Sequence, residues 1–169
     1  MNKIEERISV KNLMRYALLW LSWMILLTIF LFTFNFLRMD PDATSYTMSH
    51  SPAIFSIWLN NTQHFLQYFI FFPFAPVFIM WDSLMQVTAI TIAMKAYGFS
   101  YVLRRLLWHG LIELPNLILY SYLAMERLKI LLRYSMRAAW TIVWIRKRWF
   151  LLSYGLLVLA AIVEGAVYG

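Results

Sequence analysis

The sequence predicts an all-α integral membrane protein: a bundle of about five transmembrane helices with interfacial amphipathic helices. Of its 169 residues, 62% are hydrophobic and only 14% are charged, whereas a soluble domain is about half apolar and about a quarter charged. Too few polar side chains remain to cover a water-facing surface, which argues against a soluble enzyme. A bilayer-crossing helix needs about 20 mostly apolar residues. The chain length therefore accommodates about five of them in a single transmembrane domain, residues 1–169.

The chain begins with a polar segment and a long apolar one. Residues 1–12 are polar with apolar points at Ile4, Ile8 and Val10, which is typical of an amphipathic helix lying on the inner leaflet. The apolar stretch 13–37 is far longer than a signal-peptide core of about 7–15 residues, and no small-residue cleavage site follows it. We therefore expect an uncleaved membrane helix.

Turn signals divide the rest of the apolar sequence. A polar break at 38–51 is expected to face outside. Pro73 and Pro76 predict a kink within the second span, and Trp81-Asp82-Ser83 predicts a tight polar hairpin before the third, with Asp82 capping the third helix. The spans are expected at residues 13–37, 65–80, 84–99, 106–125 and 149–168.

Basic residues gather in two stretches, which indicates the orientation. Eleven of the fifteen Lys and Arg residues lie in residues 1–15 or 126–148, and cytoplasmic loops carry such an excess. Lys129, Arg133 and Arg137 recur every four residues, so one continuous helix would align them on one face. We expect 126–148 to be a cytoplasmic interfacial segment that contacts a partner or anionic lipid headgroups. Its basic residues are Arg127, Lys129, Arg133, Arg137, Arg146, Lys147 and Arg148.

Five spans with a cytoplasmic N-terminus put the C-terminus outside and residues 126–148 inside. Arg104 and Arg105 then lie on the outer side, against the trend, but one pair does not outweigh two clusters. A re-entrant segment would change the number of spans without changing the class.

The fourth span contains the most informative polar residues. His109 and Glu113 are four apart and share a helix face. Gly110 lets another helix approach closely, and Pro115 frees the carbonyl of Leu111. A charged acid is costly inside a membrane. Glu113 is therefore expected either to make an interhelical hydrogen bond that fixes packing or to mark a polar, proton-sensitive crossing point.

Two further polar positions have alternative interpretations. Asn60 and Asn61 are expected to cap the second span from outside, although residues 60–62 also match a glycosylation acceptor. Glu164, near the end of the last span, either faces Arg104 or Arg105 or lies in the outer headgroup region.

We expect no metal and no cofactor. The chain has no cysteine and three histidines, and His109 lacks the second His that the metalloprotease pattern places four residues away. With five glycines, the sequence has no phosphate-binding glycine loop, so any ATP hydrolysis would belong to another subunit.

These residues resemble the stage II sporulation protein M family of multi-span membrane proteins. The resemblance rests on Asn60-Asn61 opening a span, the heptad His109-Gly110-Leu111-Ile112-Glu113-Leu114-Pro115 and the late Glu164, and it covers about residues 54–169. Members of that family include a sporulation protein that holds peptidoglycan hydrolases at the engulfing membrane. Others are encoded with ABC ATPases or in circular-bacteriocin clusters, where they are thought to aid peptide export and producer immunity. The resemblance implies no enzymatic activity.

The first functional hypothesis is a non-catalytic subunit of a peptide or bacteriocin export or immunity complex in the bacterial cell membrane, acting with a separate ABC ATPase. The alternative is a membrane scaffold that anchors other proteins. An intramembrane enzyme using Glu113 and His109 ranks last because the sequence offers neither nucleophile nor metal. Homo-oligomers fit both leading hypotheses, whereas no motif supports nucleic-acid binding.

Overall fold

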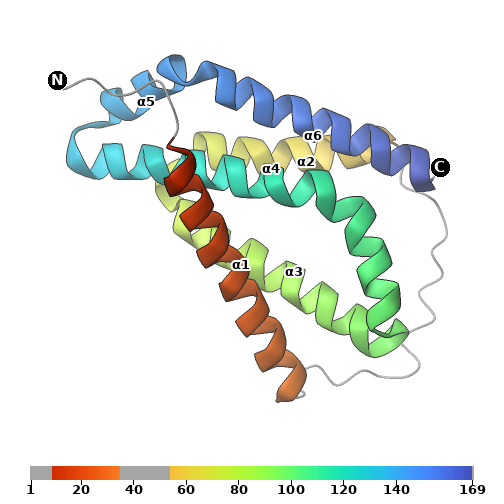
Figure 1. Cartoon of the computed structure of the whole chain (residues 1–169). Helices are drawn as coiled ribbons and strands as arrows, with labels where there is room; N and C mark the ends of the chain where they lie inside the picture. The colour runs from red at the N-terminus through yellow and green to blue at the C-terminus, as the bar shows by residue number, and fades with distance from the viewer. Residues whose placement is uncertain (1–8, 35–53, 169) are drawn as a thin grey trace.

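The computed structural model describes the backbone at residues 9–34 and 54–168, and the side chains there except at 54, 101, 105–109, 111 and 164–168. Every regular element in these two ranges is a helix (Figure 1), which confirms the all-α class. The elements are α1 (Val10–Thr33), α2 (Ile54–Ile70), the 3₁₀ turn η2 (Phe72–Phe74), α3 (Ala75–Tyr97), α4 (Phe99–Arg133), α5 (Met136–Ile145) and α6 (Lys147–Tyr168).

The first helix begins earlier than predicted. The Ser9 side chain accepts a hydrogen bond from the Asn12 backbone N–H, which is otherwise unpaired at a helix start. Residues 10–12, predicted to belong to an interfacial helix, therefore continue directly into α1, while the rest of that predicted helix lies outside the described residues. The helix ends at Thr33, short of the predicted 37.

The predicted hairpin at residues 81–83 is wrong, because these residues lie inside α3. The chain turns instead through η2, where the Phe74 N–H donates to the Phe71 carbonyl. Pro73 lies in this turn and Pro76 in the first turn of α3. The first turn of a helix tolerates proline because its N–H groups have no helical partner there. The second helix starts at Ile54, earlier than the predicted residue 65. Asn60 and Asn61 therefore lie within this helix and do not cap it.

The fourth helix is longer than its predicted span and bent. It is 35 residues long and ends at Arg133, beyond the predicted end at 125. Figure 1 shows a sharp bend about midway along it. Pro115 lies inside the helix, and a proline there cannot donate to the carbonyl one turn back. Ser135 then caps α5 by accepting from the Ala138 N–H. The interfacial segment predicted at 126–148 is thus the end of α4, the short α5 and the start of α6.

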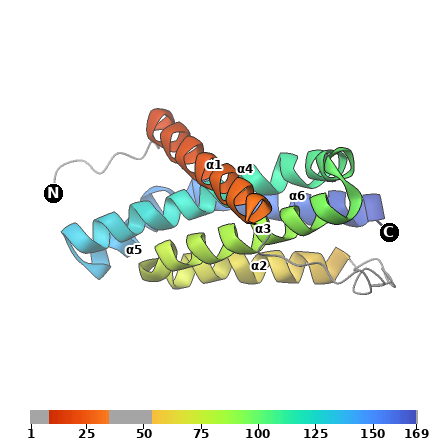
Figure 2. The ribbon, with the colours of Figure 1, turned by 90° about the horizontal axis from the view of Figure 1, so that it is seen from below.

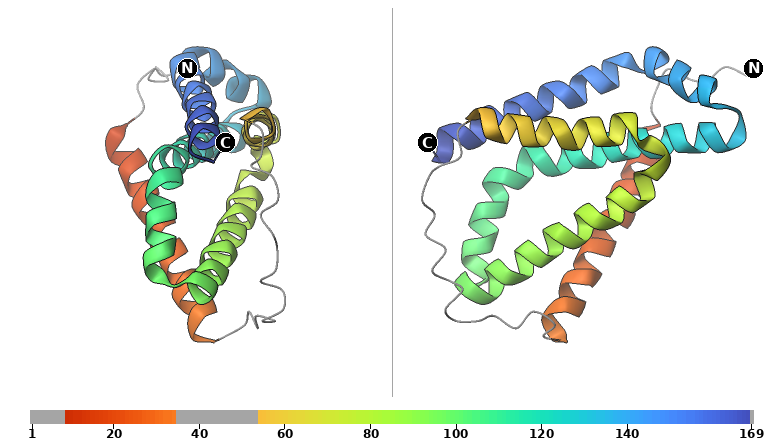
Figure 3. Two further views of the ribbon diagram at one scale, coloured as in Figure 1. Left: turned by 90° about the vertical axis from the view of Figure 1, so that its right-hand side faces the viewer. Right: turned by 180° about the vertical axis from the view of Figure 1, so that it is seen from behind.

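The helices form a bundle in which α2, the second half of α4 and α6 run side by side (Figures 1 and 3). Helices α1 and α2 lie on opposite sides of it, and α1 crosses α3 and α4 obliquely (Figure 2). The starts of α1 and α6, the turn η2 and α5 gather at one end. The end of α4 lies there too. We call this the basic end, because Lys11, Arg15 and the basic residues between 126 and 148 lie on these helix ends and on α5.

Two helical stretches, Val10–Thr33 and Phe72–Tyr97, are long and apolar enough to cross a membrane. Large apolar side chains also face outward on every long helix, among them Leu19, Leu59, Trp81 and Leu151. Soluble monomers rarely expose contiguous apolar surface of this kind.

Candidate functional site

Two predicted site residues from distant parts of the chain meet between α2 and α4. The Asn61 side-chain amide donates to Glu113 Oε1 at 3.3 Å. Both side chains are half-buried. The contact is the interhelical hydrogen bond expected from the packing interpretation of Glu113, and it gives Asn61 a role different from the predicted cap.

The other predicted intramembrane polar and structural residues take no described part in the Asn61–Glu113 hydrogen bond. Asn60 and Pro115 are exposed, and Gly110 is half-buried. The side chains of His109 and Glu164 lie outside the described part, so neither the predicted His109–Glu113 face nor the pairing of Glu164 is described.

A second polar cluster, not predicted from the sequence, lies between α2 and α3. The Tyr68 hydroxyl donates to Asp82 Oδ2 at 2.9 Å, and His64 Nδ1 lies 3.9 Å from Asp82 Oδ1. Asn61, His64 and Tyr68 are spaced by three and four residues, so they share one face of α2. That periodicity is visible in the sequence, but the interpretation of Asp82 as a hairpin residue hid its partner role.

Polar contacts also connect α4 with its other neighbours. The Ser153 hydroxyl on α6 donates to Asn116 Oδ1 at 2.6 Å, and both residues are buried. The Tyr16 hydroxyl on α1 donates to Ser121 at 3.0 Å, and Ser121 donates in turn to the Ile118 carbonyl. The Ser153–Asn116 and Tyr16–Ser121 hydrogen bonds thus connect α6 and α1 to α4.

Arg127 is not the exposed partner- or lipid-contacting residue that was predicted. Its side chain is 1% exposed, with the guanidinium 3.9 Å from the ring centre of Phe72 and 4.4 Å from that of Trp140. It donates to the backbone carbonyls of Phe69 and Ala139. Arg127 therefore ties η2 and α5 to α4.

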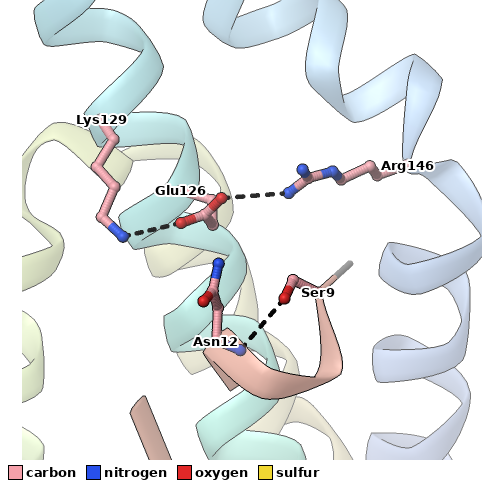
Figure 4. Close-up of polar contacts among 5 residues, drawn as sticks. All are labelled: Ser9, Asn12, Glu126, Lys129 and Arg146. Carbon is pink, nitrogen blue, oxygen red and sulfur yellow. Dashed lines mark hydrogen bonds and ion pairs between the residues drawn. The ribbon is translucent and has the colours of Figure 1, made fainter. Parts of the chain in front are cut away.

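Arg146 is also buried rather than exposed, which corrects a second predicted contact residue. Its Nη1 lies 3.6 Å from Glu126 Oε2, while Lys129 Nζ lies 2.9 Å from Glu126 Oε1 (Figure 4). Glu126 thus connects the end of α4 to the junction of α5 and α6. Burial of Arg146 is possible because this carboxylate offsets its charge.

The remaining basic residues of the segment are exposed. The helix break at Tyr134 and Ser135 places Arg137 on a different helix from Lys129 and Arg133, so the predicted single face is wrong. The exposed basic residues are Lys129, Arg133, Arg137, Lys147 and Arg148. Together with Trp144 on α5, which is also exposed, they form the outer surface of the basic end.

Within residues 9–34 and 54–168, no three His, Cys or acidic side chains whose positions are described come together as metal ligands. The site therefore consists of interhelical hydrogen bonds in the interior and a basic surface at one end. Comparison with protein-family models, curated proteins and solved structures finds no match for this chain.

Proposed function

We propose that the chain is a multi-pass protein of the bacterial cell membrane and a non-catalytic subunit of a peptide or bacteriocin export or immunity complex, acting with a separate ABC ATPase. The observation that carries the proposal is the basic end. Segments far apart in the sequence gather there, and their exposed cations give one side of the bundle a strongly positive surface.

The membrane part of the proposal rests on helix length and on what the helices expose. Besides α1 and α3, we assign α2, α4 and α6 as passes. Even the shortest, α2 with 17 residues, rises about 25 Å, close to the hydrocarbon thickness of about 30 Å. With these passes the chain alternates between the two ends, and the start of α1, the η2 turn and α5 fall on one side. The positive-inside rule makes that side cytoplasmic.

The docking part of the proposal rests on α5. This ten-residue helix is held by Arg127 on one side and by the Glu126–Arg146 pair on the other. A short helix so fixed presents Arg137 and Trp144 in a constant geometry. Arg and Trp are the residue types enriched at the energetic centres of protein interfaces. The family resemblance favours an ABC ATPase as the partner. An acidic surface on that ATPase would complement the exposed cations of the basic end.

The test is a mild-detergent pull-down of the tagged full-length protein from its native cell, with mass spectrometry of the copurifying proteins. We expect an ABC ATPase in stoichiometric amount. Joint substitution Arg133→Glu and Arg137→Glu should reduce its recovery at least about tenfold, because like charges across an interface cost several kcal/mol. A control, Lys95→Glu with Arg104→Glu, reverses the same number of charges near the end of α3 and the start of α4, at the opposite end of the bundle, and should leave ATPase recovery unchanged.

Three outcomes oppose the proposal. Copurification of peptidoglycan hydrolases or other membrane proteins without an ATPase would favour the scaffold instead. Equal loss of the ATPase in both double variants would show that the basic end is not its docking surface. Unchanged ATPase recovery, combined with weaker sedimentation of the Arg133/Arg137 variant with anionic vesicles, would assign these cations to lipid.

A further inference from the structure

The outer face of α2 carries a regular row of exposed side chains, which we call the α2 seam. Its members are Ser56, Leu59, Gln63, Leu66 and Ile70, and each of them is exposed. They follow one another at intervals of three, four, three and four residues. These intervals are the a and d spacing of a heptad, the pattern with which two helices pack along each other.

The α2 seam points away from the bundle to which α2 belongs. Ile57, Phe65 and Tyr68 are the side chains of this helix that are buried in the core, and Asn61 contacts α4. A helix turns about 100° per residue, so Gln63 lies about 200° around α2 from Asn61. Figure 2 shows α2 along one edge of the bundle, on the side opposite α1. A helix from outside this chain can therefore reach the seam.

Gln63 makes lipid alone a poor environment for this face. It lies close to the middle of the 17-residue helix, and Asn60 and Gln67 lie one turn before and after it on the same side. With α2 assigned as a membrane pass, these amides lie at the depth of the lipid tails. Hydrocarbon offers no hydrogen-bond partner, so the free energy favours a second helix that supplies one.

We propose that the α2 seam binds the same seam of a second copy of this chain, which forms a parallel homodimer within the membrane. Two copies inserted in one orientation are related by a two-fold axis along the membrane normal, so the two α2 helices meet in parallel. In a parallel pair each a position faces its own equivalent. The proposal rests on the membrane assignment of α2 made above and is independent of the ATPase.

The chemistry of Gln63 favours a second copy over a different protein. Its amide both donates and accepts hydrogen bonds, so it is complementary to the Gln63 amide of the second copy. Symmetry places that amide at the same depth, whereas a different helix would need its own polar group there. Leu59, Leu66 and Ile70 supply the apolar packing on either side. One polar side chain at an a position is a known means of fixing helix register and number.

Disulfide cross-linking tests the interface directly. The chain has no cysteine, so one introduced thiol reports on one position. We expect Gln63→Cys and Leu59→Cys, treated with a lipid-soluble oxidant in native membranes, to give a disulfide-linked dimer, because equivalent a or d positions of a parallel pair lie within reach of each other. The matched control Leu19→Cys, on α1 at the other side of the bundle and 73% exposed, should remain monomeric.

A second variant measures the contribution of the amide. Gln63→Leu removes the hydrogen bond and keeps the seam apolar. The dimer dissociation constant, measured in lipid vesicles by energy transfer between labelled copies, should therefore rise at least about fivefold. The matched control Gln86→Leu removes an amide from α3 and should leave this constant unchanged.

Cross-linking of Leu19→Cys as efficient as that of Gln63→Cys would overturn the proposal, since it would show random collision. An unchanged dissociation constant for folded Gln63→Leu would equally overturn it. If this variant does not fold, as judged by size exclusion, the cross-linking pattern decides.

Two further readouts separate this proposal from the proposed function. A chain that alkaline carbonate extracts from the membrane would refute the membrane assignment and the dimer with it. A carbonate-resistant chain that shows no Gln63→Cys cross-link would refute the dimer alone. Recovery of the ATPase is scored separately in the pull-down, so a dimer without an ATPase would leave the α2 seam supported.

Discussion

Arg127→Ala should be among the most destabilising single substitutions in this chain. It removes two hydrogen bonds from a charged donor to the carbonyls of Phe69 and Ala139, each worth about 1.5–3 kcal/mol. It also removes the contacts with the rings of Phe72 and Trp140, worth about 0.5–2 kcal/mol together when desolvated. The cost of burying the guanidinium opposes these terms, and its Nη2 has no hydrogen-bond partner in the described part of the chain. We expect a net loss of about 2–5 kcal/mol, the range for truncating a large buried side chain to alanine and leaving a cavity.

Two matched variants isolate the cause of this loss. Arg137→Ala removes the same side chain from the exposed face of α5 and should change stability by less than about 0.5 kcal/mol. Arg127→Met keeps most of the volume and removes the buried charge, so it should cost less than alanine. Unfolding in mixed micelles, followed by tryptophan fluorescence, measures all three. Equal stabilities of the Arg127→Ala and Arg137→Ala proteins would refute the anchoring role of Arg127.

Three further substitutions test other contacts. Glu113→Gln should keep the fold, because the Gln oxygen still accepts from Asn61. Glu113→Lys should sharply lower the membrane yield, which fluorescence-detected size exclusion measures. Equal yields of the two variants would show that the site is not packed. Ser153→Ala leaves the buried Asn116 oxygen without its donor and should cost about 1–3 kcal/mol in the same unfolding assay, a loss that an equally stable variant would exclude. Gly98→Ala should lower the free energy of unfolding by about 1–3 kcal/mol, because φ is 82° and ψ is 165° there, a backbone conformation that alanine rarely adopts. Open space surrounds the position, so the added methyl group causes no clash. An unchanged melting temperature would contradict this prediction.

The sequence predicts the helical class and the regions of α1, α4 and α6, because long apolar stretches are local signals, whereas the predicted span 65–80 straddles the turn between α2 and α3. The predicted position of the turn between the second and third helices was wrong, because Asp82 was interpreted as a hairpin residue and a helix cap. In fact its partner, Tyr68, lies fourteen residues away on the preceding helix, and no local pattern reveals such a contact. The two prolines mark the turn correctly once proline is placed at a helix start rather than in its interior.

The candidate site was predictable by residue type but not by contact. Asn61 and Glu113 stood out as polar groups in apolar sequence, yet their hydrogen bond depends on the packing of α2 against α4. Arg127 looked like its basic neighbours because charge alone was considered. Its burial depends on rings and carbonyls supplied by α2, η2 and α5, and only the tertiary structure brings these together.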